Sequence, residues 1–173
     1  MFEPCRKYLI DTLKDSGIHM EPITSMKRLQ LYGNSHVGAV LFEDETLRRN
    51  GSKRNYVDQG GASRKRRRLF DRDLTFQVVI GEYDPIRLDE IYQEFLKRLG
   101  HGLYVDGNFI AAEPSDVDWV EEADSILKAK IALKVAVTFY GGIYKDSDRL
   151  NLGSKTLHIR ADKVNQREEQ TDG

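Results

Sequence analysis

The sequence predicts an α+β fold: an antiparallel sheet with two helices packed on one face, and a long hairpin excursion between two strands. Three observations lead to this prediction. The apolar patterns follow the order helix, strands, helix, strands. The strands have one wet face, which argues against a doubly wound parallel sheet. A polar stretch, 44–73, separates two strands and is far longer than the usual hairpin loop of about 2–5 residues.

Length and composition indicate one domain with a tail. The chain has 173 residues, of which 39% are apolar and 32% charged. The length fits one domain, and the high charged fraction indicates that part of the chain stays outside the core. The chain is polar from Ser147 onward. We therefore expect a single domain over 1–146 and a polar C-terminal tail, 147–173, that is flexible or docks on a partner.

The first predicted helix covers 3–16. Pro4 suits its first turn, where the missing N–H costs nothing, and Gly17 can end it in a left-handed cap. Its apolar face has helical spacing and consists of Cys5, Tyr8, Leu9, Thr12 and Leu13. The weaker pattern that follows is compatible with a short strand at 28–32.

Two strands flank the polar excursion. Residues 37–43 are apolar on both faces, whereas 74–81 alternates, with Leu74, Phe76, Val78 and Ile80 on one face. The stretch between them, 44–73, is rich in Gly, Arg and Lys. We expect it to be a long basic loop or extended hairpin whose tip is mobile or projects from the body, and its length favours a functional segment or disorder over mere linkage.

The second predicted helix covers 84–99. Asp84 can cap it, Pro85 fits its first position, and Gly100 closes it. Its apolar stripe consists of Leu88, Ile91, Tyr92, Phe95 and Leu99.

The last predicted strands follow this helix. Asp106-Gly107-Asn108 is a strong hairpin signal between 103–105 and 109–112. An acidic loop is expected at 113–124. Residues 127–140 alternate strictly, which predicts a long strand with one buried face, and Gly141-Gly142 should break it.

The near-zero net charge of −1 hides a division. Residues 48–72 contain ten basic and two acidic residues, a local charge of +8, so the rest of the chain carries −9. Residues 106–124 contain seven acidic residues and no Lys or Arg. Such a dipolar chain can use complementary charges to contact copies of itself or an anionic partner; a solvated loop beside an acidic surface is the alternative.

No catalytic constellation is apparent, so the sequence predicts a protein that is not an enzyme and needs no cofactor. The four histidines are scattered, and the only cysteine is Cys5. A weaker hypothesis is a divalent-cation site in the acidic loop, although the spacing is not that of a calcium loop. Its carboxylates are Asp116, Asp118, Glu121, Glu122 and Asp124. Trp119 either anchors this loop on its own core or plugs a neighbouring subunit.

The sharpest signal is the run Arg64-Lys65-Arg66-Arg67-Arg68. Five adjacent cations can bind phosphates through counterion release, can act as a localisation tag, or can simply keep a loop soluble. In an extended hairpin they can also face an acidic surface on an adjacent subunit. The acidic segment 106–124 supplies such a surface, so we expect a subunit interface at Asp116, Asp118, Trp119, Glu121 and Glu122.

The chain contains no apolar run of membrane-spanning length and no apolar signal core near Met1, and Cys5 is alone. We therefore expect a protein of a reducing cytoplasm with no membrane partner.

Several segments together carry a resemblance to a known family. They are Arg72-Asp73-Leu74-Thr75-Phe76-Gln77-Val78-Val79-Ile80-Gly81, Phe95-Leu96-Lys97-Arg98-Leu99, Val105-Asp106-Gly107-Asn108, Trp119-Val120, Asp124-Ser125-Ile126-Leu127-Lys128-Ala129-Lys130 and Phe139-Tyr140-Gly141-Gly142-Ile143-Tyr144. Over roughly residues 1–146 the chain resembles the small tail-terminator or tail-completion (minor tail) proteins of tailed bacteriophages and prophages. The shared motifs are patterned rather than catalytic.

The resemblance implies a non-enzymatic structural protein. Such proteins form a homo-oligomeric ring, often a hexamer, at the head-proximal end of the tail. The ring stops tube polymerisation and joins tail to head, with the tail-tube and head-completion proteins as partners. The expected location is the virion tail, after assembly in the bacterial host cytoplasm. The basic excursion would line the lumen or contact the tube or DNA through Arg64, Lys65, Arg66, Arg67, Arg68 and Arg72. The alternative function is a nucleic-acid-binding module that acts through 64–72.

Overall fold

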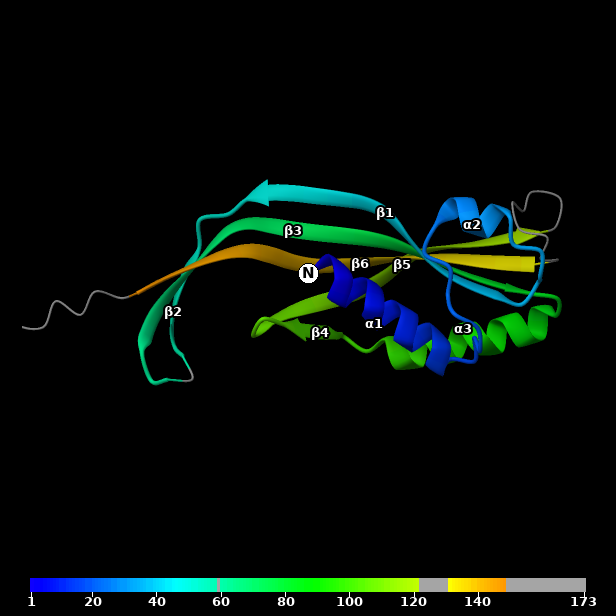
Figure 1. Ribbon diagram of the computed structural model, residues 1–173, viewed down its shortest axis with the longest axis horizontal. Coiled ribbons are helices and arrows are strands. Elements are labelled where there is room, and N and C mark those ends of the chain that lie inside the picture. The colour runs from blue at the N-terminus through cyan, green and yellow to red at the C-terminus, as the bar shows by residue number, and fades with distance from the viewer. Residues whose placement is uncertain (59, 122–130, 149–173) are drawn as a thin grey trace, which may run out of the picture.

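The computed structural model describes residues 1–58, 60–121 and 131–148, which form one antiparallel sheet with helices against it (Figure 1). This part of the chain contains six strands and three helices, so the predicted α+β class is confirmed. In chain order the elements are α1 (Phe2–Asp15), α2 (Met26–Gln30), β1 (Val37–Arg49), β2 (Lys53–Val57), β3 (Ser63–Glu82), α3 (Pro85–Leu99), β4 (Gly102–Val105), β5 (Asn108–Glu121) and β6 (Ile131–Asp148).

The two longest strands, β3 and β6, form the centre of the sheet. The strand order is β1-β3-β6-β5-β4, and β2 pairs with the first residues of β3. The ladder between β3 and β6 runs from Arg64 opposite Asp148 to Glu82 opposite Ile131. In Figure 1 this pair extends along the molecule, with the helices beside one half and β2 at the opposite end.

The main core lies between one face of the sheet and the helices α1 and α3. Leu9 and Leu13 of α1 and Phe95 of α3 are fully buried against Phe76 and Phe139 of the central strands. At about 25 cal/mol per Å² of apolar area, such burial is the dominant stabilising term. The predicted pair of helices on one face is therefore confirmed. Asp84 caps α3 as expected, accepting a hydrogen bond from the backbone N–H of Ile86.

A smaller cluster lies on the opposite face of the sheet, beneath α2. Leu29 of this helix and Ile23 before it pack on Ala39, Leu41 and Val79, whose side chains point away from α1 and α3 because strand residues alternate. The short strand expected at 28–32 is wrong, because a helical turn over Met26–Gln30 is what buries Leu29. A five-residue helix is stabilised by such packing rather than by its own propensity.

The excursion at 44–73 is folded as strands rather than as a loop. β1 continues to Arg49, β3 already begins at Ser63, and β2 lies between them. Together with the end of β6 they build a projection from the body, visible on the left of Figure 1. We call β2, residues 63–72 of β3 and residues 141–148 of β6 the arm. The extended hairpin of the prediction is present, but its backbone donors and acceptors pair within the sheet.

The predicted break at Gly141-Gly142 is wrong, since β6 runs through both residues to Asp148. These glycines allow close approach instead. A Cβ on Gly141 would lie 2.5 Å from the Met1 side chain, and one on Gly142 would lie 3.0 Å from the carbonyl oxygen of Phe70. The boundary expected at 146 therefore falls within a strand, and 149–173 lies outside the described residues.

The hairpin between β4 and β5 is confirmed, with Asp106 and Gly107 at φ 50° and 72° in its tight turn. The acidic loop expected at 113–124 is wrong as far as Glu121, because these residues continue β5 and pair with β6. Residues 122–130, which include the predicted start of the last strand, lie outside the described part.

Candidate functional site: the basic arm and the acidic edge

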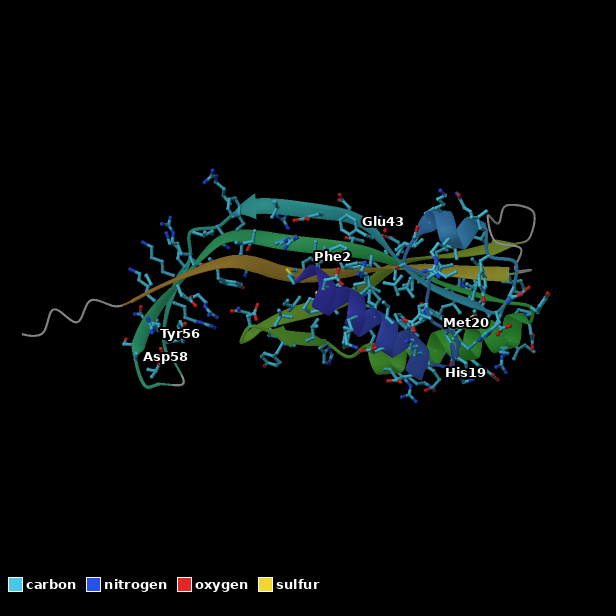
Figure 2. All side chains as sticks on the ribbon, in the orientation of Figure 1. Phe2, His19, Met20, Glu43, Tyr56 and Asp58 are labelled. Carbon is cyan, nitrogen blue, oxygen red and sulfur yellow. The ribbon has the colours of Figure 1, made fainter. Side chains whose placement is uncertain are left out.

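The basic run of the arm lies in β3, between β2 on one side and β6 on the other. Because side chains alternate along a strand, the five cations are divided between two faces. Arg64, Arg66 and Arg68 are partly buried, whereas Lys65 and Arg67 are exposed. Figure 2 shows Tyr56 and Asp58 at this end of the molecule, well away from His19 and Met20 beside the helices.

Arg66 is the centre of the first face. Its Nε and Nη2 donate to the two carboxylate oxygens of Asp146 at 2.7 and 2.6 Å, and Nη1 donates to Asn108 at 3.0 Å. Its guanidinium also lies 4.8 Å from the ring centroid of Tyr56 and 5.7 Å from that of Tyr144. Hydrogen bonding to Arg66 lowers the pKa of Asp146 and raises the pKa of Arg66 itself. This arginine therefore fastens β3 to β6 and to the tip of the β4–β5 hairpin.

The two neighbours of Arg66 along β3 on this face are held as well. Arg64 Nε donates to Asp58 at 2.8 Å, and this bond lowers the pKa of Asp58. Arg68 Nη2 donates to the carbonyl oxygen of Gly141 at 2.6 Å. Its Nε lies 2.7 Å from Asp71 Oδ1, an ion-pair contact that lacks the alignment of a hydrogen bond. We call Arg64, Arg66 and Arg68 with these partners the paired face.

The other face of the arm carries cations on three adjacent strands. Lys53 of β2, Arg67 of β3 and Lys145 of β6 lie directly opposite one another, and Lys65 is two residues from Arg67. All four are exposed, and none has a hydrogen bond or ion pair to a carboxylate within 1–58, 60–121 and 131–148. Like charges directly opposite across strands are destabilising, so this arrangement is a cost to the isolated chain. We call these four residues the free face.

Arg72 is the last of the predicted contact residues, and it lies in β3 between the basic run and the body of the sheet. Its Nε donates to Glu45 Oε1 at 2.8 Å, and its side chain is 25% exposed. Arg72 therefore holds β3 to β1 and does not continue the free face.

The acidic residues lie on the open edge of β5. Asp116 occupies a bulge with φ 43°, and Asp118 is opposite Lys134 of β6. Trp119 is 46% exposed and is not part of the core, whereas Leu133, its partner on β6, is fully buried. Glu121 ends β5, and Glu122 and Asp124 lie outside the described residues. The predicted interface residues that can be placed thus share an exposed strand edge.

The structure brings the start of the acidic segment, at Asn108, to Arg66 of the basic run, but within one chain it keeps Asp116 and Asp118 away from the arm. Asp118 lies beside Lys134 and Arg67 beside Lys145, which are eleven positions apart on β6. At about 3.3 Å per residue this separation is roughly 36 Å along the strand. The exposed carboxylates Asp116 and Asp118 and the free face therefore occupy different ends of the sheet.

Sequence reasoning missed the cations that join the run from other strands. In the sequence Lys53 is one cation of the basic segment 48–72, and Lys145 follows the strand break predicted at Gly141-Gly142. The only available signal was the alternation of the run itself, which would have separated its two faces if 64–68 had been assigned to a strand. The exposed carboxylates of β1, Glu43 and Asp44, were missed as well.

Within the described ranges, no group of three or more His, Cys, Asp or Glu side chains is arranged to hold a metal ion. In the same part of the chain no helix is long and apolar enough to cross a bilayer. No family model matches the chain, and no curated protein sequence matches it.

Proposed function

We propose that this protein is a non-enzymatic structural subunit that assembles into a ring, of the kind that terminates or completes the tail of a bacteriophage. The ring would cap the tail tube and join it to the head. The observation that carries the proposal is the separation of unpaired opposite charges on one chain, with the free face at the end of the arm and the acidic edge on β5.

This separation favours self-association over a solvated surface. Most carboxylates near the arm are already used, since Asp58, Asp71 and Asp146 each hold an arginine. The cations that remain unpaired cannot reach the β5 edge of their own chain. A second copy, however, presents that edge. Contacts between two different patches on identical subunits are heterologous and close into rings when the rotation allows.

The proposed role in a bacteriophage tail rests on the sequence resemblance together with the proposed contact between copies. The resemblance also implies an α+β fold in which helices lie on one side of a sheet, and the sheet with α1 and α3 on one face agrees with it. The arm extends beyond the helices and is suited to contact a tube, DNA or a neighbouring subunit (Figure 1).

Adding the protein to a polymerising tail-tube protein tests the proposed role. We expect tubes to stop growing and electron micrographs to show a ring at one end. An unchanged distribution of tube lengths, at concentrations where the added protein is itself a ring, would rule out the capping role while leaving assembly intact.

A second candidate, nucleic-acid binding, is favoured by one observation, the row Lys53–Arg67–Lys145. Strands lie about 4.8 Å apart, so the row presents three unpaired cations over roughly 10 Å. Such a row can neutralise phosphates without reading sequence.

Fluorescence anisotropy with a labelled DNA duplex tests this candidate. The affinity should fall steeply with salt, and K53Q/R67Q/K145Q should reduce the slope of log K against log salt by about 2.7 if all three residues contact phosphates. The matched control is K7Q/K97Q/R98Q on the helices. Equal slopes for the two triple variants would eliminate nucleic-acid binding by the free face.

A further inference from the structure

The face of the sheet opposite α1 and α3 contains an open trough. It has a volume of about 480 Å³ and spans β1, β3, β6 and β5. Its floor consists of half-buried polar or small side chains, among them Thr75 and Thr138, whose hydroxyl oxygens lie 3.0 Å apart. α2 covers only the other end of this face, around Ala39 and Val79. The trough is therefore a polar surface that the described part of the chain leaves open.

Carboxylates rim the trough on both sides, and two β-bulges place them there. Glu43 and Asp44 lie at the irregularity in β1, and Asp116 lies at the one in β5 with Asp118 beyond it. A bulge re-aims side chains, so two consecutive residues can turn toward the same face. Lys134 is the only cation in the lining of this trough.

None of these carboxylates is used inside the described chain. Glu43, Asp44, Asp116 and Asp118 are exposed and have no ion pair within 1–58, 60–121 and 131–148. Glu113, which is opposite Thr138 on the same face, is also exposed and has no ion pair to a described residue. The four lining carboxylates and Lys134 give the trough a charge of −3, and Glu113 beside it on the same face brings the sum over these described residues to −4.

We infer that the trough of one copy receives the free face of the arm of a second copy. The free face carries four unpaired cations, Lys53, Lys65, Arg67 and Lys145, which match the net charge of −4. This inference rests on the proposed ring-forming function and identifies the surfaces that make the contact. Unlike the predicted interface, it includes β1 residues and does not depend on Trp119.

The contact must be between copies, for two geometric reasons. Lys145 and Thr138 are seven residues apart on β6, roughly 23 Å at about 3.3 Å per residue. Because successive side chains of a strand alternate between its faces, two residues seven positions apart point to opposite faces. The free face and the trough therefore lie on opposite faces of the sheet. An arm therefore cannot reach its own trough. The resulting contact is heterologous, and each bound copy leaves one arm and one trough for the next.

The electrostatic character of this contact has measurable consequences. Exposed charges are screened beyond a Debye length of about 8 Å at physiological salt. Complementary patches of this size raise association rates more than they slow dissociation. Assembly should therefore be fast, and it should weaken with rising salt.

Charge-reversed variants of the full chain, studied by size-exclusion chromatography with light scattering, test the inference. The arm variant is K53E/R67E/K145E, and the trough variant is E43K/D44K/D118K. Each should remain a monomer at concentrations where the wild type assembles, because arm and trough then carry like charges. An equimolar mixture should assemble again, since each variant's arm now complements the other's trough. K7E/K97E/R98E, with the same charge change as the arm variant, should assemble like the wild type.

The outcomes separate the inference from the proposed function. If the wild type assembles and both variants assemble equally well alone, the inference is overturned and the ring-forming function stands. If both variants melt within a few degrees of the wild type but fail to assemble when mixed, the inference is overturned as well. The neutral variants K53Q/R67Q/K145Q and E43Q/D44N/D118N replace any reversed variant that does not fold, and each should weaken assembly at least tenfold. A wild type that stays monomeric at every concentration overturns both.

Discussion

The two faces of the arm come from one five-residue run and differ in how their charges are satisfied. On the paired face, Arg66 is 15% exposed and is held by a bidentate bond to Asp146. On the free face, Lys65 and Arg67 have no carboxylate partner in the part of the chain that the structure describes. A strand thus separates structural cations from available ones, because alternate residues meet different surroundings. The local charge of +8 overstates what the arm can offer a partner.

The largest expected difference between the faces is in the stability of the arm. Arg66→Ala removes charge-assisted hydrogen bonds to Asp146 and stacking on two tyrosines, and bonds of this class contribute about 1.5–3 kcal/mol. We expect the opening free energy of the arm to fall by about 2 kcal/mol. Amide hydrogen exchange in β2 and at the end of β6 measures this opening.

Arg67→Ala is the matched control for Arg66→Ala. It removes an exposed cation with like-charged neighbours, so exchange in the arm should change by less than about 0.5 kcal/mol. Equal losses of protection in the two variants would mean that the faces do not differ as described.

Acid should affect the paired face selectively. The folded-state pKa values of Asp58 and Asp146 are lowered by their arginines, so the stabilisation is complete above the ordinary carboxyl pKa of about 3.8 and is lost as pH falls below it. Amide exchange at 64–68, corrected for intrinsic rates, should accelerate between roughly pH 4 and pH 2. Asp146→Asn should already exchange faster at neutral pH and should respond less to acid. A response equal to that of the wild type would contradict the assignment of this carboxylate.

The smallest expected effect concerns the aromatic side chains beside the arginines. The Tyr144 ring lies 5.7 Å from the Arg66 guanidinium and 5.8 Å from that of Arg68. Tyr144→Leu keeps an apolar side chain but removes both cation–π contacts, each worth about 0.5–1 kcal/mol at an exposed site. Tyr144→Phe retains the ring and should preserve arm protection. Identical exchange in the Leu and Phe variants would show that these contacts contribute nothing.

The sequence was sufficient for the fold class, for α1 and α3 and for the β4–β5 hairpin, because apolar period and capping residues agree at those positions. Two such signals depend only on neighbouring residues and are therefore readable in the sequence. They are the helix cap at Asp84 before Pro85 and the tight turn at Asp106-Gly107-Asn108. The sequence was insufficient where packing or pairing with a distant segment decides the secondary structure. Leu29 becomes helical through its packing on Ala39 and Val79, and the basic run becomes a strand because β2 and β6 pair with it on both sides.

The candidate site was predictable in part for the same reason. Composition located the basic and acidic poles, and Arg67 and Asp118 are exposed at them. It could not show that Arg64, Arg66 and Arg68 are occupied by intrachain partners, since Asp146 lies 80 positions from Arg66. Nor could it place Lys53 beside Lys145, or Glu43 across the sheet from Asp116. These groupings depend on strand order and register, which lie beyond local patterns.

Measuring the mass of the wild-type chain in solution tests directly whether it assembles into a ring. Light scattering at near-physiological and at high salt, over a wide range of protein concentration, supplies this mass. We predict one closed species at low and physiological salt whose mass is a fixed multiple of 19.9 kDa, and dissociation at high salt. A mass of 19.9 kDa at every concentration and salt condition would contradict the account.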